Sequence, residues 1–229
     1  MRRLALLAIN VLAQVGIFAF ATRAQADPIT VPTSLAPGAQ YRLAFVTSTT
    51  LNSFSSEIAG YNAFVDGVAE SVPELAALGQ DWKAIASTEL VNVLLNTSTD
   101  PSPAGLTGVP IFLLNDTKLV DDYDDLWDGS IDVPLNIGQS GVLVSGTIAT
   151  RVWTGTGADG TTAYGLGGSG STVGSVSSST STWINFTFRT AAEHHRLYAI
   201  SGVLTVVPEP CTAFLLASGL AALAVRRRR

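Results

Sequence analysis

The sequence is poor in cysteine and in histidine. Its 229 residues include one cysteine, Cys211, near the C-terminal end. The rest of the chain can form neither a disulfide nor a thiolate metal site, so its fold must be held by packing alone. The two histidines, His194 and His195, are neighbours in sequence. Neighbouring residues of a strand point to opposite faces, so the sequence does not favour a metal site that both histidines share.

Basic residues are also scarce outside the two ends of the chain. Residues 27–207 contain six Lys and Arg against 17 Asp and Glu, a net charge of −11, although the whole chain carries −5. The other seven arginines lie in the first 26 residues and at the last four positions. Nucleic acids and anionic lipid surfaces require a basic face. The acidic middle of the chain therefore excludes both as partners.

The first 26 residues have the pattern of a secretory signal peptide. Arg2 and Arg3 precede an apolar run from Leu4 to Phe20, and Ala24 and Ala26 provide a small-x-small cleavage site for signal peptidase. The alternative is an uncleaved N-terminal membrane helix. Cleavage after Ala26 leaves a body at residues 27–206, long enough for one domain with its own core.

The C-terminal segment, residues 207–229, combines a proline motif, an apolar stretch and an arginine cluster. Val207, Pro208, Glu209, Pro210 and Cys211 form the motif, and the prolines keep it extended. Residues 211–225 carry no charge and would make a helix of about 22 Å, which can span a bilayer by local thinning. The arginines, which would stop transfer on the cytoplasmic side, are Arg226, Arg227, Arg228 and Arg229.

This order of motif, short helix and terminal arginines resembles the PEP-CTERM sorting signal of Gram-negative and related bacteria. The resemblance implies that an exosortase cleaves near the motif and releases the body to the cell surface or extracellular matrix. Before cleavage, the helix would hold the protein in the inner membrane. Cys211 departs from the pattern, which usually has Ser or Thr at that position. The alternative is a plain single-pass anchor that is not cleaved.

The body has helical patterns early and strand patterns late, which predicts an α+β fold with an antiparallel sheet. Strands are expected at 41–47, 82–86, 109–114, 141–153, 183–188, 196–200 and 203–206. Helices are expected at 53–69, 73–79 and 88–96. Residues 158–181 are rich in Gly, Ser and Thr and predict a long loop.

Four separated segments of the body resemble the C-type-lectin-like fold in its bacterial, endostatin-related variant. They are Phe45–Thr50 before a helix, Trp82–Ala84, Val152–Thr156 with Asp159–Thr161, and Trp183 with Leu197–Ile200. The resemblance spans residues 41–206 and implies a domain that is framed by its first and last strands and carries a long loop. Two features of the family are missing: a cysteine to close the loop, and the acidic triplets of calcium-dependent sugar binding.

A ligand site is expected beside the long loop, with aromatic rings for stacking on sugars. The candidate residues are Trp153, Asp159, Tyr164 and Trp183. The alternative for the tryptophans is packing in the core, where such side chains are found more often.

An acidic run offers candidate calcium ligands, because calcium binds several carboxylate oxygens on a flexible turn. Its spacing does not match an EF-hand loop, and the interleaved aromatic residues favour a solvated acidic turn over a buried layer. The acidic residues are Asp121, Asp122, Asp124, Asp125 and Asp128.

Together these patterns predict an exported, non-enzymatic surface or matrix protein. Its body would be structural, adhesive or carbohydrate-binding, with extracellular polysaccharide as a partner and no required cofactor. The alternative is an extracellular hydrolase acting on matrix polymer. No Gly-x-Ser-x-Gly nucleophile elbow supports that alternative: Gly168-Ser169-Gly170 lacks the five-residue frame.

Overall fold

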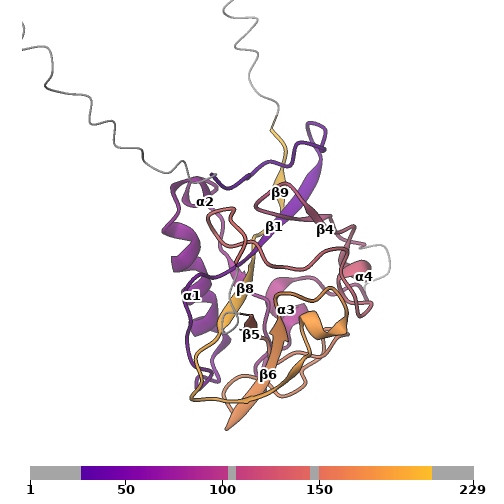
Figure 1. Cartoon of the computed structure of the whole chain (residues 1–229). Helices are drawn as coiled ribbons and strands as arrows, with labels where there is room; N and C mark the ends of the chain where they lie inside the picture. The colour runs from indigo at the N-terminus through magenta and orange to yellow at the C-terminus, as the bar shows by residue number, and fades with distance from the viewer. Residues whose placement is uncertain (1–26, 103–106, 145–149, 208–229) are drawn as a thin grey trace, which may run out of the picture.

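The computed structural model describes residues 27–102, 107–144 and 150–207. These residues form an α+β fold with one large sheet and four short α-helices (Figure 1). The elements in chain order are β1 (Gln40–Val46), α1 (Ile58–Glu70), α2 (Pro73–Ala76), β2 (Lys83–Ala84), α3 (Val93–Thr97), β3 (Ile111–Leu113), β4 (Lys118–Val120), α4 (Tyr123–Leu126), β5 (Arg151–Trp153), β6 (Gly170–Ser175), the 3-10 helix η1 (Ser181–Trp183), β7 (Thr187–Thr190), β8 (Arg196–Ile200) and β9 (Leu204–Thr205).

The sheet is mixed, and the prediction of an antiparallel sheet is wrong in that respect. Its main strand order is β4-β3-β1-β8-β5-β6-β7, with β2 paired to β8 and β9 paired to β1. The β1–β3 and β5–β8 pairs are parallel, and the other strand pairs are antiparallel. Parallel pairs need long crossover connections. The segment with α1, α2 and α3 provides that crossover between β1 and β3.

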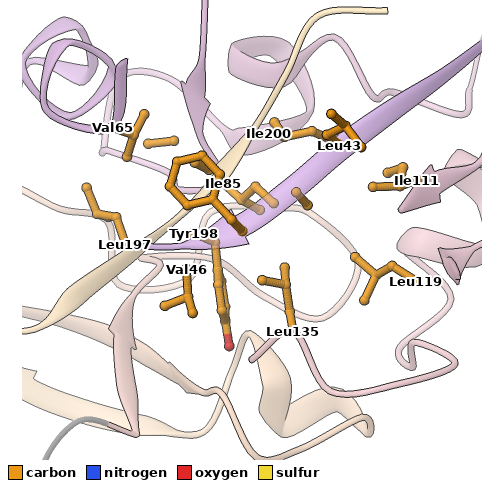
Figure 2. Packing of buried hydrophobic residues seen from close by; sticks show 14 of the residues in the cluster. Leu43, Val46, Val65, Ile85, Ile111, Leu119, Leu135, Leu197, Tyr198 and Ile200 are labelled. Carbon is orange, nitrogen blue, oxygen red and sulfur yellow. The ribbon is translucent and has the colours of Figure 1, made fainter. Parts of the chain in front are cut away.

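The first and last strands meet at the centre of the fold. β1 pairs with β8 over its last three residues and with β9 at its start. Six of the seven residues of β1 are buried, because the strand has neighbours on both edges and is covered on both faces. One hydrophobic cluster extends from Tyr41 to Val206, and Figure 2 shows Leu43 and Val46 of β1, Val65 of α1 and Ile200 of β8 within it.

The first helix packs against the sheet through one apolar stripe. Tyr61, Val65 and Ala69 are buried, and α1 contacts β2 and β8. The helix begins at Ile58, five residues later than the pattern predicts. Residues 53–57 precede the helix without helical structure, and there the Ser55 hydroxyl accepts a hydrogen bond from the Glu57 amide at 3.1 Å.

Two predicted segments near the C-terminal half differ from the structure. The Gly/Ser/Thr-rich stretch 158–181 is not one loop, because Gly170–Ser175 forms β6, whose residues are almost all buried. The predicted strand 183–188 begins as the 3-10 helix η1, and β7 follows only at Thr187. Glycine-rich composition therefore reflects close packing here: a Cβ at Gly174 would lie 2.0 Å from the Trp183 carbonyl oxygen.

Three further expectations are corrected by the structure. The predicted short helix 88–96 is shifted to α3, and Leu90 and Leu95 are exposed rather than inward. Of the predicted strand 141–153, only β5 is regular, and residues 145–149 lie outside the described part. The acidic run predicted as a solvated turn follows β4 and contains the short helix α4.

Several predicted features lie outside the described residues. These are the signal peptide with Ala24 and Ala26, the motif positions Pro208–Cys211, the apolar stretch 211–225 and the terminal arginines. Val207, the last described residue, is exposed. In the part of the chain that is described, no helix has the length and apolar character needed to cross a bilayer.

Candidate functional site

Both candidate tryptophans are core residues. Trp153 is fully buried, donates its indole N–H to the Leu51 carbonyl at 2.8 Å and meets the His195 ring edge-to-face. Trp183 is also fully buried, with ring centroids 6.1 Å from Trp127 and 5.8 Å from Tyr198. Neither ring presents a face to solvent, so neither can stack on a sugar. The core alternative holds for both residues.

The segment that follows Trp153 is fixed by buried hydroxyl groups. Thr154 donates from its hydroxyl to the Ile184 carbonyl at 2.6 Å, and Thr156 donates to the Thr154 carbonyl at 2.7 Å. The Ser87 hydroxyl bonds to the Thr156 hydroxyl at 2.9 Å. Each hydrogen bond satisfies a buried polar group and adds about 1 kcal/mol. In a body without disulfides, this network holds the chain that leads to Tyr164.

Tyr164 is the aromatic candidate that faces solvent. Its side chain is 66% exposed, and its ring lies edge-to-face against Phe188 of β7, with centroids 5.3 Å apart. Two backbone contacts position it: the Ala163 amide donates to the Gly155 carbonyl at 3.0 Å, and the Tyr164 amide donates to the Thr172 hydroxyl at 3.3 Å. The ring is thus held at the surface by the hydroxyl-rich segment beneath it.

Phe188 completes this aromatic pair, and sequence reasoning missed it. It is 46% exposed and lies on β7, the last strand in the sheet order. A Cβ at Gly170 would lie 2.4 Å from the Phe188 ring, so only glycine at 170 allows the ring to lie there. Phe186 is also exposed and lies two residues earlier, just before β7 begins at Thr187. The signal in the sequence is the Phe-x-Phe alternation at 186–188, within the strand predicted at 183–188.

The aromatic pair borders a surface groove of about 380 Å³, which we call the aromatic groove. Its other walls are polar or small and include one charged residue, Glu89. Aromatic rings provide large, rigid contact area, and a few polar groups around them fix orientation. The full lining consists of Glu89, Thr162, Ala163, Tyr164, Gly165, Gly168, Ser169, Gly170 and Phe188.

Asp159 does not line the aromatic groove. Its carboxylate accepts hydrogen bonds from the Thr161 hydroxyl at 2.6 Å and the Thr161 amide at 3.0 Å. These two bonds hold the pKa of Asp159 below its ordinary value, because they favour the charged form. Asp159 therefore stabilises its own turn.

The five candidate calcium ligands are not gathered around one point. Asp122 caps α4 by accepting from the Asp125 amide at 3.0 Å, and Asp125 accepts from the Asp121 amide at 2.7 Å. Asp128 accepts from the Ser130 amide at 2.9 Å, and Asp124 lies in the first turn of α4. Tyr123, Leu126 and Trp127 are buried beneath them. In the described ranges, no group of three or more potential metal ligands is brought together.

The two histidines have different surroundings. His194 is exposed, whereas His195 is buried and its Nε2 lies 3.3 Å from a Glu193 carboxylate oxygen. Burial lowers the pKa of His195, and the Glu193 carboxylate opposes that effect only in part. No hydroxyl of the described chain hydrogen-bonds to His195, so the arrangement gives no support to a Ser-His pair.

Comparison with models of known protein families gives no match to this chain, and comparison with curated proteins gives none either.

Proposed function

We propose that this chain is an exported bacterial surface or matrix protein whose body binds carbohydrate at the aromatic groove. The single observation that supports this most is the exposed Tyr164–Phe188 pair above polar and glycine backbone. The weakly polar C–H faces of sugar rings pack on aromatic surfaces, while hydroxyl groups bond to nearby polar atoms. No observation of comparable weight favours the hydrolase.

We further propose that the body is a C-type-lectin-like domain. Three observations support this. β1 pairs with β8 and β9, and the early helix α1 packs on the sheet. A long segment of chain also lies between Trp153 and β8. That segment differs from the expected long loop because it contains the paired strands β6 and β7. Two residues that line the groove, Gly170 and Phe188, lie on these strands. The lining contains one carboxylate, Glu89, so the proposed sugar site does not depend on a set of calcium ligands.

Tyr164→Ala should weaken glycan binding by about tenfold or more, because a central aromatic side chain contributes over about 1.4 kcal/mol at such sites. Phe188→Ala should weaken binding as well, because it removes both a contact and the support of Tyr164. Isothermal titration of residues 27–207 with a glycan retained on an array measures both effects.

The matched control is Phe54→Ala. Phe54 is 60% exposed but does not line the aromatic groove. This variant should bind as tightly as the wild type. Equal losses in Phe54→Ala and Tyr164→Ala would show that the groove is not the site.

For export, Glu209→Ala should leave uncleaved precursor in the inner membrane, because the change removes the one charged residue of the Pro-Glu-Pro motif. Cell fractionation and immunoblotting of the body measure precursor and processed protein. Glu70→Ala, at an exposed glutamate of α1, is the matched control and should be processed normally. Normal processing of Glu209→Ala would contradict exosortase sorting and leave the plain membrane anchor.

A further inference from the structure

A second cavity has a buried arginine at its wall. Arg42 lies in β1, between Tyr41 and Leu43, and is only 4% exposed. Burial of a charged group is costly unless a partner compensates it. Burial accordingly lowers the pKa of Arg42, although a guanidinium remains protonated at any physiological pH. Such a residue in a central strand requires an explanation.

The guanidinium is held by neutral groups rather than by a carboxylate. Its Nε donates to the Ser201 carbonyl at 2.7 Å, and its Nη1 donates to the Thr97 carbonyl at 2.8 Å. The Tyr123 hydroxyl lies 3.4 Å from Nη1, and the Tyr123 ring centroid lies 5.8 Å from Cζ. These contacts fix the plane of the guanidinium.

The remaining nitrogen, Nη2, makes no hydrogen bond within the described residues. No ion pair of Arg42 is found there either: the ion pairs in that part join Lys118 to Asp121 and His195 to Glu193. The two internal segments outside the description, 103–106 and 145–149, contain no acidic residue that could serve. The described residues therefore give Arg42 a fixed orientation and no ion-pair partner.

Arg42 lines a pocket of about 460 Å³, which we call the arginine pocket. Lys83 of β2 also lines it, so two of the six basic residues of an acidic body meet at one cavity. Asp81 is the one acidic residue on the wall, which leaves a net charge of +1. The other polar lining groups include Gln80, Asn96 and Ser98. A volume of this size lies within the range of small-molecule sites.

We infer that the arginine pocket binds the carboxylate of an acidic sugar, such as a uronate. A fixed guanidinium whose Nη2 makes no hydrogen bond to the described residues, together with a nearby ammonium, is a donor set that carboxylates bind. The net charge of +1 matches one carboxylate and would leave a divalent sulfate or phosphate uncompensated. The sugar part of this inference rests on the proposed function, whereas the carboxylate part rests on the pocket alone.

The test is isothermal titration of residues 27–207, which contain the whole hydrophobic cluster, with galacturonate and with its methyl ester. Galacturonate should bind, and the neutral ester should bind about tenfold more weakly or not at all, because charge-assisted hydrogen bonds are lost. High salt should weaken galacturonate binding. Equal binding of acid and ester would overturn the inference.

Two variants at the arginine pocket should change the affinity for galacturonate in opposite directions. Lys83→Met should weaken galacturonate binding by about fivefold, and Asp81→Asn should tighten it by about threefold, because charges near a protein surface interact by about 1 kcal/mol. Arg42→Lys tests the guanidinium itself but leaves buried carbonyls short of donors and can unfold the body. Substitutions at Lys83 and Asp81 should leave the fold intact, because neither residue belongs to the buried core. Lys118→Met, at a lysine outside the pocket, is the matched control.

The outcome also separates this inference from the proposed function. If galacturonate binding depends on Lys83 but no glycan depends on Tyr164, the arginine pocket stands and the aromatic groove fails. If galacturonate binding is lost in Tyr164→Ala and unchanged in Lys83→Met, the groove is the site and this inference is overturned.

Discussion

Gly155→Ala should destabilise the body by about 3–5 kcal/mol, a large part of the stability of an ordinary domain. Gly155 has φ +61°, where a side chain costs about 1–2 kcal/mol. A Cβ there would lie 2.3 Å from the Ser87 carbonyl oxygen and 2.9 Å from the Leu166 amide nitrogen. Both neighbours are backbone atoms, so the clash can be relieved only if these backbone segments move apart.

That movement would break backbone hydrogen bonds that hold Thr154 and its neighbours in place. The Ser87 amide donates to the Thr154 carbonyl at 2.7 Å, and the Leu166 amide donates to the Ser87 carbonyl at 2.9 Å. Urea denaturation followed by circular dichroism measures the loss. Gly67→Ala is the control. Gly67 is an exposed residue of α1, and no other atom lies within 4 Å of the position that a Cβ would take. The variant should be more stable than the wild type by about 1 kcal/mol, because alanine favours a helix more than glycine does. A Gly155→Ala variant as stable as the wild type would contradict this packing.

Trp183→Ala should cost about 3–5 kcal/mol, the usual range for removing a large aromatic side chain from a core. Trp183 is fully buried against Trp127 and Tyr198, and its truncation leaves a cavity that these rings cannot fill. Its indole nitrogen has no hydrogen-bond partner within the described residues. Trp183→Phe should therefore cost less, about 1–2 kcal/mol, because it also removes an unsatisfied buried N–H group.

The same two variants separate a core role from a ligand role. Because Trp183 has no exposed face, the folded Trp183→Phe body should bind glycan with unchanged affinity. Denaturation monitored by tryptophan fluorescence gives stability, and titration gives affinity. A loss of glycan affinity without a loss of stability would place Trp183 in the binding site and contradict the assignment to the core.

Sequence patterns predicted the secondary structure best where local chemistry and burial agree. The segments 41–47 and 196–200 have strongly β-forming residues, and both became central strands. The pattern failed at Gly170–Ser175, where glycines and hydroxyl residues look like a loop. There the strand forms because β5 and β7 approach it closely and its hydroxyl groups find hydrogen-bond partners elsewhere in the fold. Both are tertiary effects.

Sequence reasoning named one of the two aromatic residues that border the groove. Composition indicated aromatic residues beside the 158–181 segment, and Tyr164 does lie exposed there. Which aromatic residues are exposed depends on the packing of the complete fold, so sequence reasoning included the buried Trp153 and Trp183 and missed Phe188. The sequence also gives no sign that Arg42 is buried, because only the pairing of β1 with its neighbours shows this and shows that no described carboxylate forms an ion pair with it.

A glycan-array screen of residues 27–207 tests the central claim most directly, in calcium and in chelator. We expect at least one glycan to be retained in both conditions, because no calcium ligand set lines the aromatic groove. We also expect Tyr164→Ala to lose that glycan and Phe54→Ala to keep it. Retention of no glycan by the wild-type body in either condition would contradict carbohydrate binding.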